Sequence, residues 1–103
     1  DVKRKTFVLA NKTGGLSGPA IKPIAVRMVY QVYNSVKIPI IGMGGIADAM
    51  DALEFIMAGA SMVAVGTANF YNPYATVMIA DGIKEYMINN GVNDIKELIG
   101  CVN

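Results

Sequence analysis

Two short hydrophobic runs, each ending in a glycine turn, constrain the fold of this chain most. The first, residues 38–43, is rich in isoleucine and ends at Gly44-Gly45, and the second, residues 62–65, ends at Gly66-Thr67. Short continuous apolar runs are typical of strands that are buried on both faces of a parallel sheet. The segment between them is long enough for one crossover helix, so the two runs predict a parallel βαβ unit.

The segment between the two runs carries the signals of a helix. Asp48 is a suitable N-cap, and Asp51 places a negative charge in the first turn, where the helix dipole favours it. Gly59 stands where a C-terminal glycine cap belongs. The predicted buried face of this helix consists of Ala52, Leu53, Phe55, Ile56 and Met57.

The flanking segments continue this alternation. Residues 6–9 resemble a short strand, residues 11–18 form a glycine-rich exposed loop, and a helix is predicted from about residue 20 until shortly before Pro39. Another helix is predicted between Pro73 and Gly91, and a capping-box pattern at residues 94–97 predicts a short last helix. The apolar stripe predicted for the first helix is Ile21, Ala25, Met28, Val29, Val32 and Val36, and we interpret the seven methionines as core residues.

This order of strands and helices predicts an α/β fold. Two well-marked strands, however, do not make a sheet that helices can cover on both faces, and its apolar edges would be open. We therefore expect the chain to be part of a larger α/β domain.

The composition excludes several classes of function. The 103 residues are 53% hydrophobic and 17% charged with a net charge of +1, so no charge excess draws the chain to nucleic acid or an acidic membrane surface. There is no histidine, which excludes His-based nucleophilic catalysis and His-ligated metal sites, and we expect no metal site. The single cysteine, Cys101, fits a reducing compartment. We expect neither a membrane span nor a signal peptide.

The two glycine turns are candidates for binding a phosphate group. Glycine lets backbone N–H groups approach an anion closely, and Thr67 adds a hydroxyl donor. In (β/α)8 barrels a phosphate often binds to the loops after the last two strands. Either turn alone is also compatible with an ordinary strand-to-helix connection, but the two together favour a phosphate site. A side chain added at Gly44 is then expected to enter the phosphate position.

A dinucleotide site is a weaker alternative. Gly42, Gly44 and Ala47 fit the pattern Gly-x-Gly-x-x-Ala between a strand and a helix. That pattern also requires an acidic residue at the end of the next strand to hold the ribose. The next strand ends in Val65-Gly66-Thr67 instead.

Five motifs follow one another along the chain: Gly14-Gly15-Leu16-Ser17-Gly18, Ile21-Lys22-Pro23, Ile40-Ile41-Gly42-Met43-Gly44-Gly45-Ile46, Ala58-Gly59-Ala60-Ser61 and Val65-Gly66-Thr67-Ala68-Asn69-Phe70. In their order and spacing, nearly the whole chain resembles dihydroorotate dehydrogenase. Among the subtypes it resembles the NAD-linked class 1B catalytic subunit, because the membrane-associated class differs at Gly66 and the fumarate-linked class differs around Ser17 and Asn69.

The resemblance implies an FMN-binding TIM barrel, a (β/α)8 fold, of which residues 1–103 are the C-terminal part of a single domain. Residues 38–43 and 62–65 would be its last two strands, and residues 7–9 would belong to an excursion before its sixth helix. By the same resemblance, the residues that contact FMN, mostly at its phosphate, are Gly18, Gly44, Gly45, Gly66 and Thr67.

The resemblance also implies that this segment holds no catalytic residue. In the family the base is a cysteine on an earlier loop, and a lysine and several asparagines that hold flavin and orotate also lie upstream. Cys101 is in no matching motif, so we interpret it as a bystander. We interpret Lys22 as a solvated or loop-bracing residue rather than as a phosphate ligand, because it lies in the first turn of a helix. Tyr71 and Tyr74 could either line the flavin pocket or pack at an interface.

As a function, the resemblance implies FMN-dependent oxidation of dihydroorotate to orotate, a step of pyrimidine biosynthesis, by the intact protein in the cytoplasm. The implied partners are a second catalytic subunit and an electron-transfer subunit with FAD and an iron–sulfur cluster. The 103 residues alone are expected to be inactive. Two alternatives stay open: a non-catalytic barrel fragment that associates with itself, and another FMN- or phosphate-binding TIM barrel such as a dihydropyrimidine dehydrogenase domain.

Overall fold

A computed structural model describes residues 1–102 and has the predicted α/β architecture. In chain order its elements are the 3₁₀ helix η1 (Pro19–Ile21), α1 (Lys22–Tyr33), β1 (Ile41–Met43), α2 (Ala49–Ala58), β2 (Met62–Ala64), α3 (Ala68–Tyr71), α4 (Ala75–Asn89) and the 3₁₀ helix η2 (Ile95–Leu98). None of the helices within residues 1–102 combines the length and apolar character that crossing a membrane requires.

The two strands lie side by side and run parallel. Ile41 is paired with Met62, and Met43 with Ala64, while α2 forms the connection between the strands. This confirms the predicted βαβ unit. Because parallel strands end at the same edge, the turns that follow β1 and β2 are brought together.

Helix α2 begins and ends at the predicted residues. The Asp48 side chain accepts the backbone N–H of Asp51, and the Asp51 side chain accepts that of Asp48, which completes a capping box. Gly59 caps the other end with a φ of +124°. Four of the five residues of the predicted face are buried, and Met57 is half-buried.

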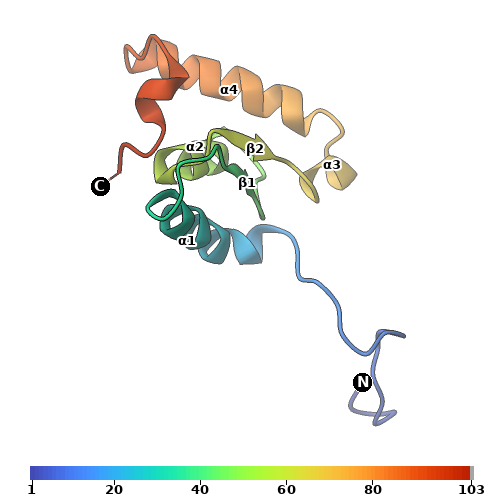
Figure 1. Ribbon diagram of the computed structural model, residues 1–103. Coiled ribbons are helices and arrows are strands. Elements are labelled where there is room, and N and C mark those ends of the chain that lie inside the picture. The colour runs from blue at the N-terminus through green and yellow to red at the C-terminus, as the bar shows by residue number, and fades with distance from the viewer. Residues whose placement is uncertain (103) are drawn as a thin grey trace.

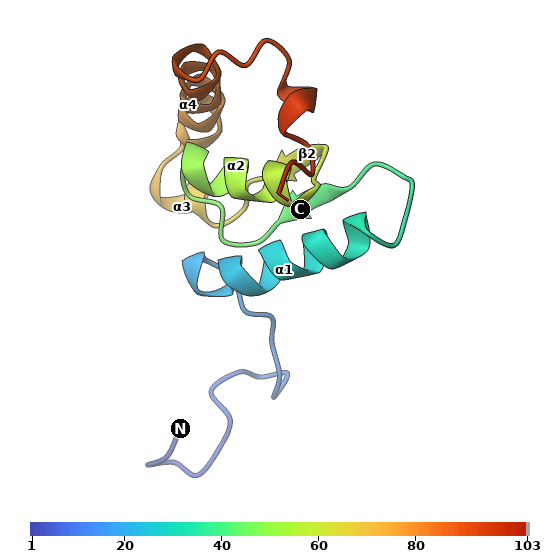
Figure 2. The same ribbon diagram turned by 90° about the vertical axis from the view of Figure 1, so that its left-hand side faces the viewer.

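The core lies around α2, which packs between α1 and α4 (Figures 1 and 2). Phe55, at 0% exposure, is at its centre. The main buried cluster comprises Val29, Ile46, Ala52, Phe55, Ala58, Ala60 and Ile79, and a second one comprises Leu53, Ile56 and Leu98. The turn after β1 is therefore anchored in the core through Ile46.

The strands differ from the prediction in length and burial. β1 begins at Ile41 rather than at residue 38, and β2 ends at Ala64. Gly42 is buried against α2, but Ile41 and Met43 on the opposite face are 56% and 64% exposed. The prediction of burial on both faces is wrong for residues 1–102, because helices cover only one face of this two-stranded sheet.

The strand expected at residues 6–9 is also wrong. This segment consists of turns and bends, and Phe7, Val8 and Leu9 are exposed. No strand of the described chain lies beside it, so its β propensity finds no hydrogen-bonding partner. Residues 1–17 instead run away from the helices (Figure 1).

Two further expectations about side chains need correction. In α1 the inward face comprises Ala25, Val26 and Val29, whereas Met28 and Val32 are exposed, so the predicted stripe is rotated. Five methionines are more than half exposed and are not core residues: Met28, Met43, Met50, Met62 and Met78.

The last predicted helix exists with its capping box at Asp94 and Glu97, but it is the 3₁₀ helix η2.

Candidate functional site

A cavity of about 270 Å³ lies where β1, β2 and the start of α1 come together. Its walls come from the loop before η1, the turn after β1 (residues 44–47, hereafter the first glycine turn) and the turn after β2 (residues 66–67, the second glycine turn). All five residues predicted to contact FMN line this cavity: Gly18, Gly44, Gly45, Gly66 and Thr67. The fold thus gathers the predicted set in one place.

The first glycine turn needs glycine for its backbone conformation. Gly44 and Gly45 have φ angles of +121° and +76°, in the region that residues with a Cβ rarely adopt. A Cβ on Gly45 would also lie only 2.7 Å from the carbonyl oxygen of Gly18 and 3.0 Å from the backbone nitrogen of Lys22. This turn is therefore packed directly against the loop that leads into α1.

We expected a side chain at Gly44 to enter the phosphate position, and this expectation is wrong. A Cβ there would lie 2.9 Å from Ala25 Cβ and 3.0 Å from Ile21 Cδ1, both on the side of the first helix. A larger residue would therefore clash with Ile21 and Ala25 and push the turn away from them, instead of filling open space in the cavity.

Gly18 and Gly66, unlike Gly44 and Gly45, have open space where a Cβ would lie. A Cβ on either residue would meet no heavy atom within 4 Å, although both residues line the cavity. The space that a side chain would fill at these positions is free for a ligand to approach the backbone. The cavity thus has the form expected of a glycine-lined anion cradle.

The backbone also offers hydrogen-bond donors. Within residues 1–102, the N–H groups of Gly45, Ile46, Gly66 and Thr67 donate to no protein acceptor. No charged side chain belongs to the part of the lining that the structure describes. An anion in this cavity would therefore be held by main-chain N–H groups and by uncharged hydroxyl groups such as that of Thr67, which suits a phosphate group.

Of the other predicted residues, Tyr71 lines the cavity and Tyr74 does not. Cys101 is exposed and is not part of the lining, consistent with its interpretation as a bystander. Ile46 was not predicted from the sequence to be a ligand-contacting residue. Its N–H belongs to the set of available donors, and no side-chain pattern could have indicated that.

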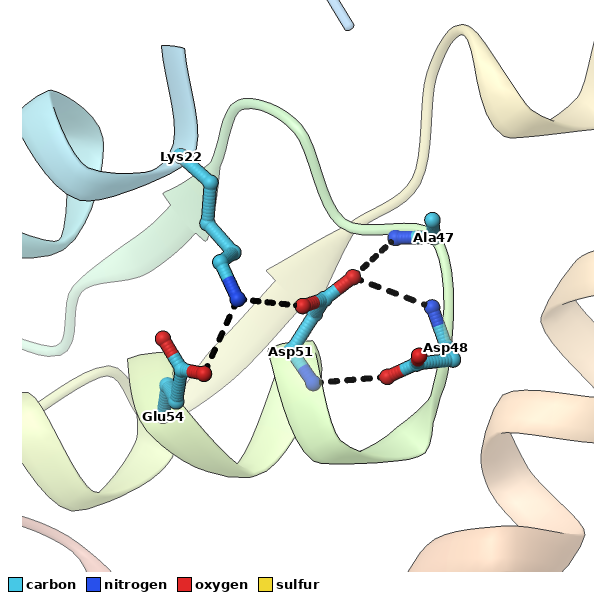
Figure 3. Close-up of polar contacts among 5 residues, drawn as sticks. All are labelled: Lys22, Ala47, Asp48, Asp51 and Glu54. Atoms are coloured by element: carbon cyan, nitrogen blue, oxygen red, sulfur yellow. Dashed lines mark hydrogen bonds and ion pairs between the residues drawn. The ribbon is translucent and has the colours of Figure 1, made fainter. Parts of the chain in front are cut away.

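A cluster of charged residues contacts the end of the first glycine turn, outside the cavity (Figure 3). Lys22 Nζ is 2.5 Å from Asp51 Oδ1 and 2.9 Å from Glu54 Oε1. Asp51 Oδ2 accepts the N–H groups of Ala47, at 2.9 Å, and Asp48, at 3.3 Å. The structure supports the loop-bracing interpretation of Lys22, since its Nζ contacts these carboxylates and the residue does not line the cavity.

These contacts shift the protonation equilibria of both partners. Hydrogen bonds to Asp51 and Glu54 raise the pKa of Lys22. Burial on its own raises the pKa of Asp51, but the hydrogen bonds from Lys22 and the Ala47 N–H outweigh it and lower that pKa below 3.8. Both groups are therefore charged at neutral pH.

Sequence comparison gives a consistent set of relatives. The family model for dihydroorotate dehydrogenase matches residues 1–87. The chain is 70% identical over 102 residues to the dihydroorotate dehydrogenase B (NAD(+)) catalytic subunit of Lachnoclostridium phytofermentans, covering 99% of this chain. It is 60% identical over 103 residues to the protein of the same name from Desulforamulus reducens, covering 100% of this chain. In both cases the chain spans 34% of the relative's length.

Two similar solved structures are also structures of DHODH. The crystal structure of DHODH from Eimeria tenella in complex with ferulenol superposes with a TM-score of 0.79 at 30% identity, covering 91% of this chain and 26% of that chain. The ligand-free structure of DHODH from the same organism superposes with a TM-score of 0.80 at 30% identity, covering 94% of this chain and 28% of that chain.

Proposed function

The chain belongs to the dihydroorotate dehydrogenase family, and from this premise we propose that it is the C-terminal part of an FMN-binding (β/α)8 barrel that oxidises dihydroorotate to orotate. In this proposal residues 1–103 lie in one domain, and β1 and β2 are its last two barrel strands. Because the chain spans about a third of the length of its curated relatives, the activity is proposed for the whole protein.

The cavity between the glycine turns is the observation that supports this proposal most. We propose that it receives the phosphate of FMN, with Gly18, Gly44, Gly45, Gly66 and Thr67 as the contacting residues. Three separate loops contribute these residues to one cavity. Its available N–H groups and the open space beside Gly18 and Gly66 favour an anionic ligand that lies close to the backbone.

FMN, when bound, would supply the chemistry of accepting a hydride. The residues of this chain would supply binding energy and orientation. The N–H groups of the two glycine turns and the Thr67 hydroxyl would donate to phosphate oxygens, and such charge-assisted hydrogen bonds are stronger than neutral ones. Since the first glycine turn is anchored in the core through Ile46, the phosphate would be held at a fixed position relative to the strands.

The names of the relatives support a proposal about partners. They are called NAD(+)-type catalytic subunits, so we propose NAD as the final electron acceptor and an electron-transfer subunit as the partner. Following the family resemblance, that partner would carry FAD and an iron–sulfur cluster, and the catalytic subunit would form a homodimer in the cytoplasm.

The substitution Gly66→Val (G66V) tests the phosphate site. It places a branched side chain in open space at the cavity wall, so it should displace the phosphate without disturbing the fold. In the full-length protein as its gene encodes it, we expect FMN affinity to fall roughly ten- to a hundredfold, the equivalent of losing one or two hydrogen bonds to a charged group. Affinity for riboflavin, which lacks the phosphate, should change much less. Fluorescence titration measures both dissociation constants.

Gly15→Val is the matched control. A Cβ on Gly15 would also meet no heavy atom within 4 Å, but this residue does not line the cavity. We expect the variant to bind FMN like the unsubstituted protein. If G66V keeps its preference for FMN over riboflavin, the phosphate does not bind between the glycine turns.

A further inference from the structure

The charged cluster of Lys22, Asp51 and Glu54 connects two elements that build the cavity. Lys22 is the first residue of α1, and the two carboxylates belong to the first turns of α2 (Figure 3). The Lys22 and Asp51 side chains are only 24% and 14% exposed, whereas that of Glu54 is 51% exposed. The Lys22–Asp51 pair is therefore the shielded part of the cluster, and Glu54 is its solvent side.

Asp51 fixes the end of the first glycine turn. One of its oxygens accepts the N–H groups of Ala47 and Asp48, which removes these two donors from the set available to a ligand. The N–H groups of Gly45 and Ile46, immediately before them, remain without a protein acceptor within residues 1–102. The carboxylate thus determines which part of the turn can receive an anion.

This arrangement places the negative charge of Asp51 against the end of the first glycine turn, outside the cavity lining. The cavity lining contains no cation in the part of the chain described, so nothing in the lining offsets the charge of Asp51. Lys22 offsets the charge of Asp51 from outside the lining, because its Nζ contacts the other oxygen of the same carboxylate. Its backbone nitrogen also lies next to Gly45, which joins the start of α1 to the turn.

We infer that Lys22 is a positioning residue for the anion site: through Asp51 it holds the first glycine turn in place and neutralises a carboxylate that would otherwise repel the ligand's phosphate. The inference rests on the proposed function, since it assumes that a phosphate binds at this turn. Lys22 itself does not line the cavity and acts only through Asp51.

The test compares FMN with riboflavin in the full-length protein. In Lys22→Met (K22M), we expect the preference for FMN over riboflavin to fall at least roughly tenfold, since one uncompensated charge near the anion at an effective dielectric constant of about 20 is worth at least that much. Riboflavin affinity should stay close to that of the unsubstituted protein. Lys22→Arg retains the charge and should restore most of the preference, and Glu54→Gln, on the solvent side, should leave it nearly unchanged.

A double variant separates repulsion from loss of folding. Lys22→Met/Asp51→Asn removes both charges, so it should bind FMN more tightly than K22M does. Equal FMN affinities in these two variants, or an unchanged FMN preference in K22M, would overturn the inference while the proposed phosphate site stands. If the unsubstituted protein binds FMN and riboflavin equally well, the proposed phosphate site fails, and the role of Lys22 fails with it.

Discussion

At the scale of single residues, Asp51 combines three separate roles. It completes the capping box of α2, accepts the N–H of Ala47 and pairs with Lys22. No local sequence pattern indicates the last contact, because Lys22 and Asp51 are far apart in the chain and meet only when α1 packs on α2. The sequence predicted Asp51 in the first turn of α2 but could not predict that it also fixes the end of the first glycine turn through the Ala47 N–H.

The protein's stability should therefore depend on pH through Asp51. Its pKa is lowered in the folded state from 3.8, so its contribution is fully present above that pH and is lost as the pH falls through the lowered value. We expect Asp51→Asn to reduce the free energy of unfolding near neutral pH and to flatten its decline in acid. Urea unfolding between about pH 7 and about pH 2 measures this.

Asp81→Asn is the control for this experiment. Asp81 is exposed on α4, and its side chain makes no ion pair within residues 1–102. Its variant should follow the pH profile of the unsubstituted protein. Identical acid profiles for Asp51→Asn and the unsubstituted protein would contradict the role assigned to Asp51.

At the scale of elements, local signals predicted helix ends well and strand environment poorly. Asp48 and Gly59 act on their own backbone neighbours, so the bounds of α2 were readable from the sequence. The environment of a strand depends on what packs against it, which explains the unexpected exposure of Ile41 and the absence of a strand at residues 6–9. Helix α3, with only four residues, gave no periodic signal at all.

The contact between β1 and α2 depends on the absence of a side chain at Gly42. A Cβ there would lie 2.7 Å from Phe55 Cδ1 and 3.0 Å from Ala60 Cβ. We expect Gly42→Ala to overpack this contact and to lower the free energy of unfolding by about 1–3 kcal/mol, measured by urea unfolding. Gly15→Ala, in open space, should change it little. Equal stabilities of the two variants would show that β1 can move away from α2 freely.

At the scale of the whole molecule, the chain is more extended than a compact domain of its length. Its radius of gyration is 16.4 Å, compared with about 13 Å expected for roughly 100 residues. Residues 1–17 account for part of this, since they run away from the helices (Figure 1). The sheet also leaves one apolar face uncovered within residues 1–102.

The uncovered face should make the 103-residue chain associate with itself. Ile41 and Met62 are neighbours across the two strands and are 56% and 59% exposed, and an exposed apolar patch tends to pack against another protein surface. We expect size-exclusion chromatography with light scattering to find oligomers, and Ile41→Lys/Met62→Lys to shift them toward monomer. Met50→Lys, on the exposed side of α2, should not. A stable monomer of the unsubstituted chain would contradict this expectation.

A pocket walled by main-chain amides has an evolutionary consequence. Exchanging polar side chains can retune it only at the hydroxyl positions of its lining, such as Thr67, because elsewhere torsion angles and free volume decide what it accepts. If the proposed phosphate site is correct, its selectivity should thus drift slowly while the surrounding sequence diverges. Novel ligand preferences would have to arise at the few bordering positions that do carry a reactive or bulky group, chiefly Ser17 and Tyr71.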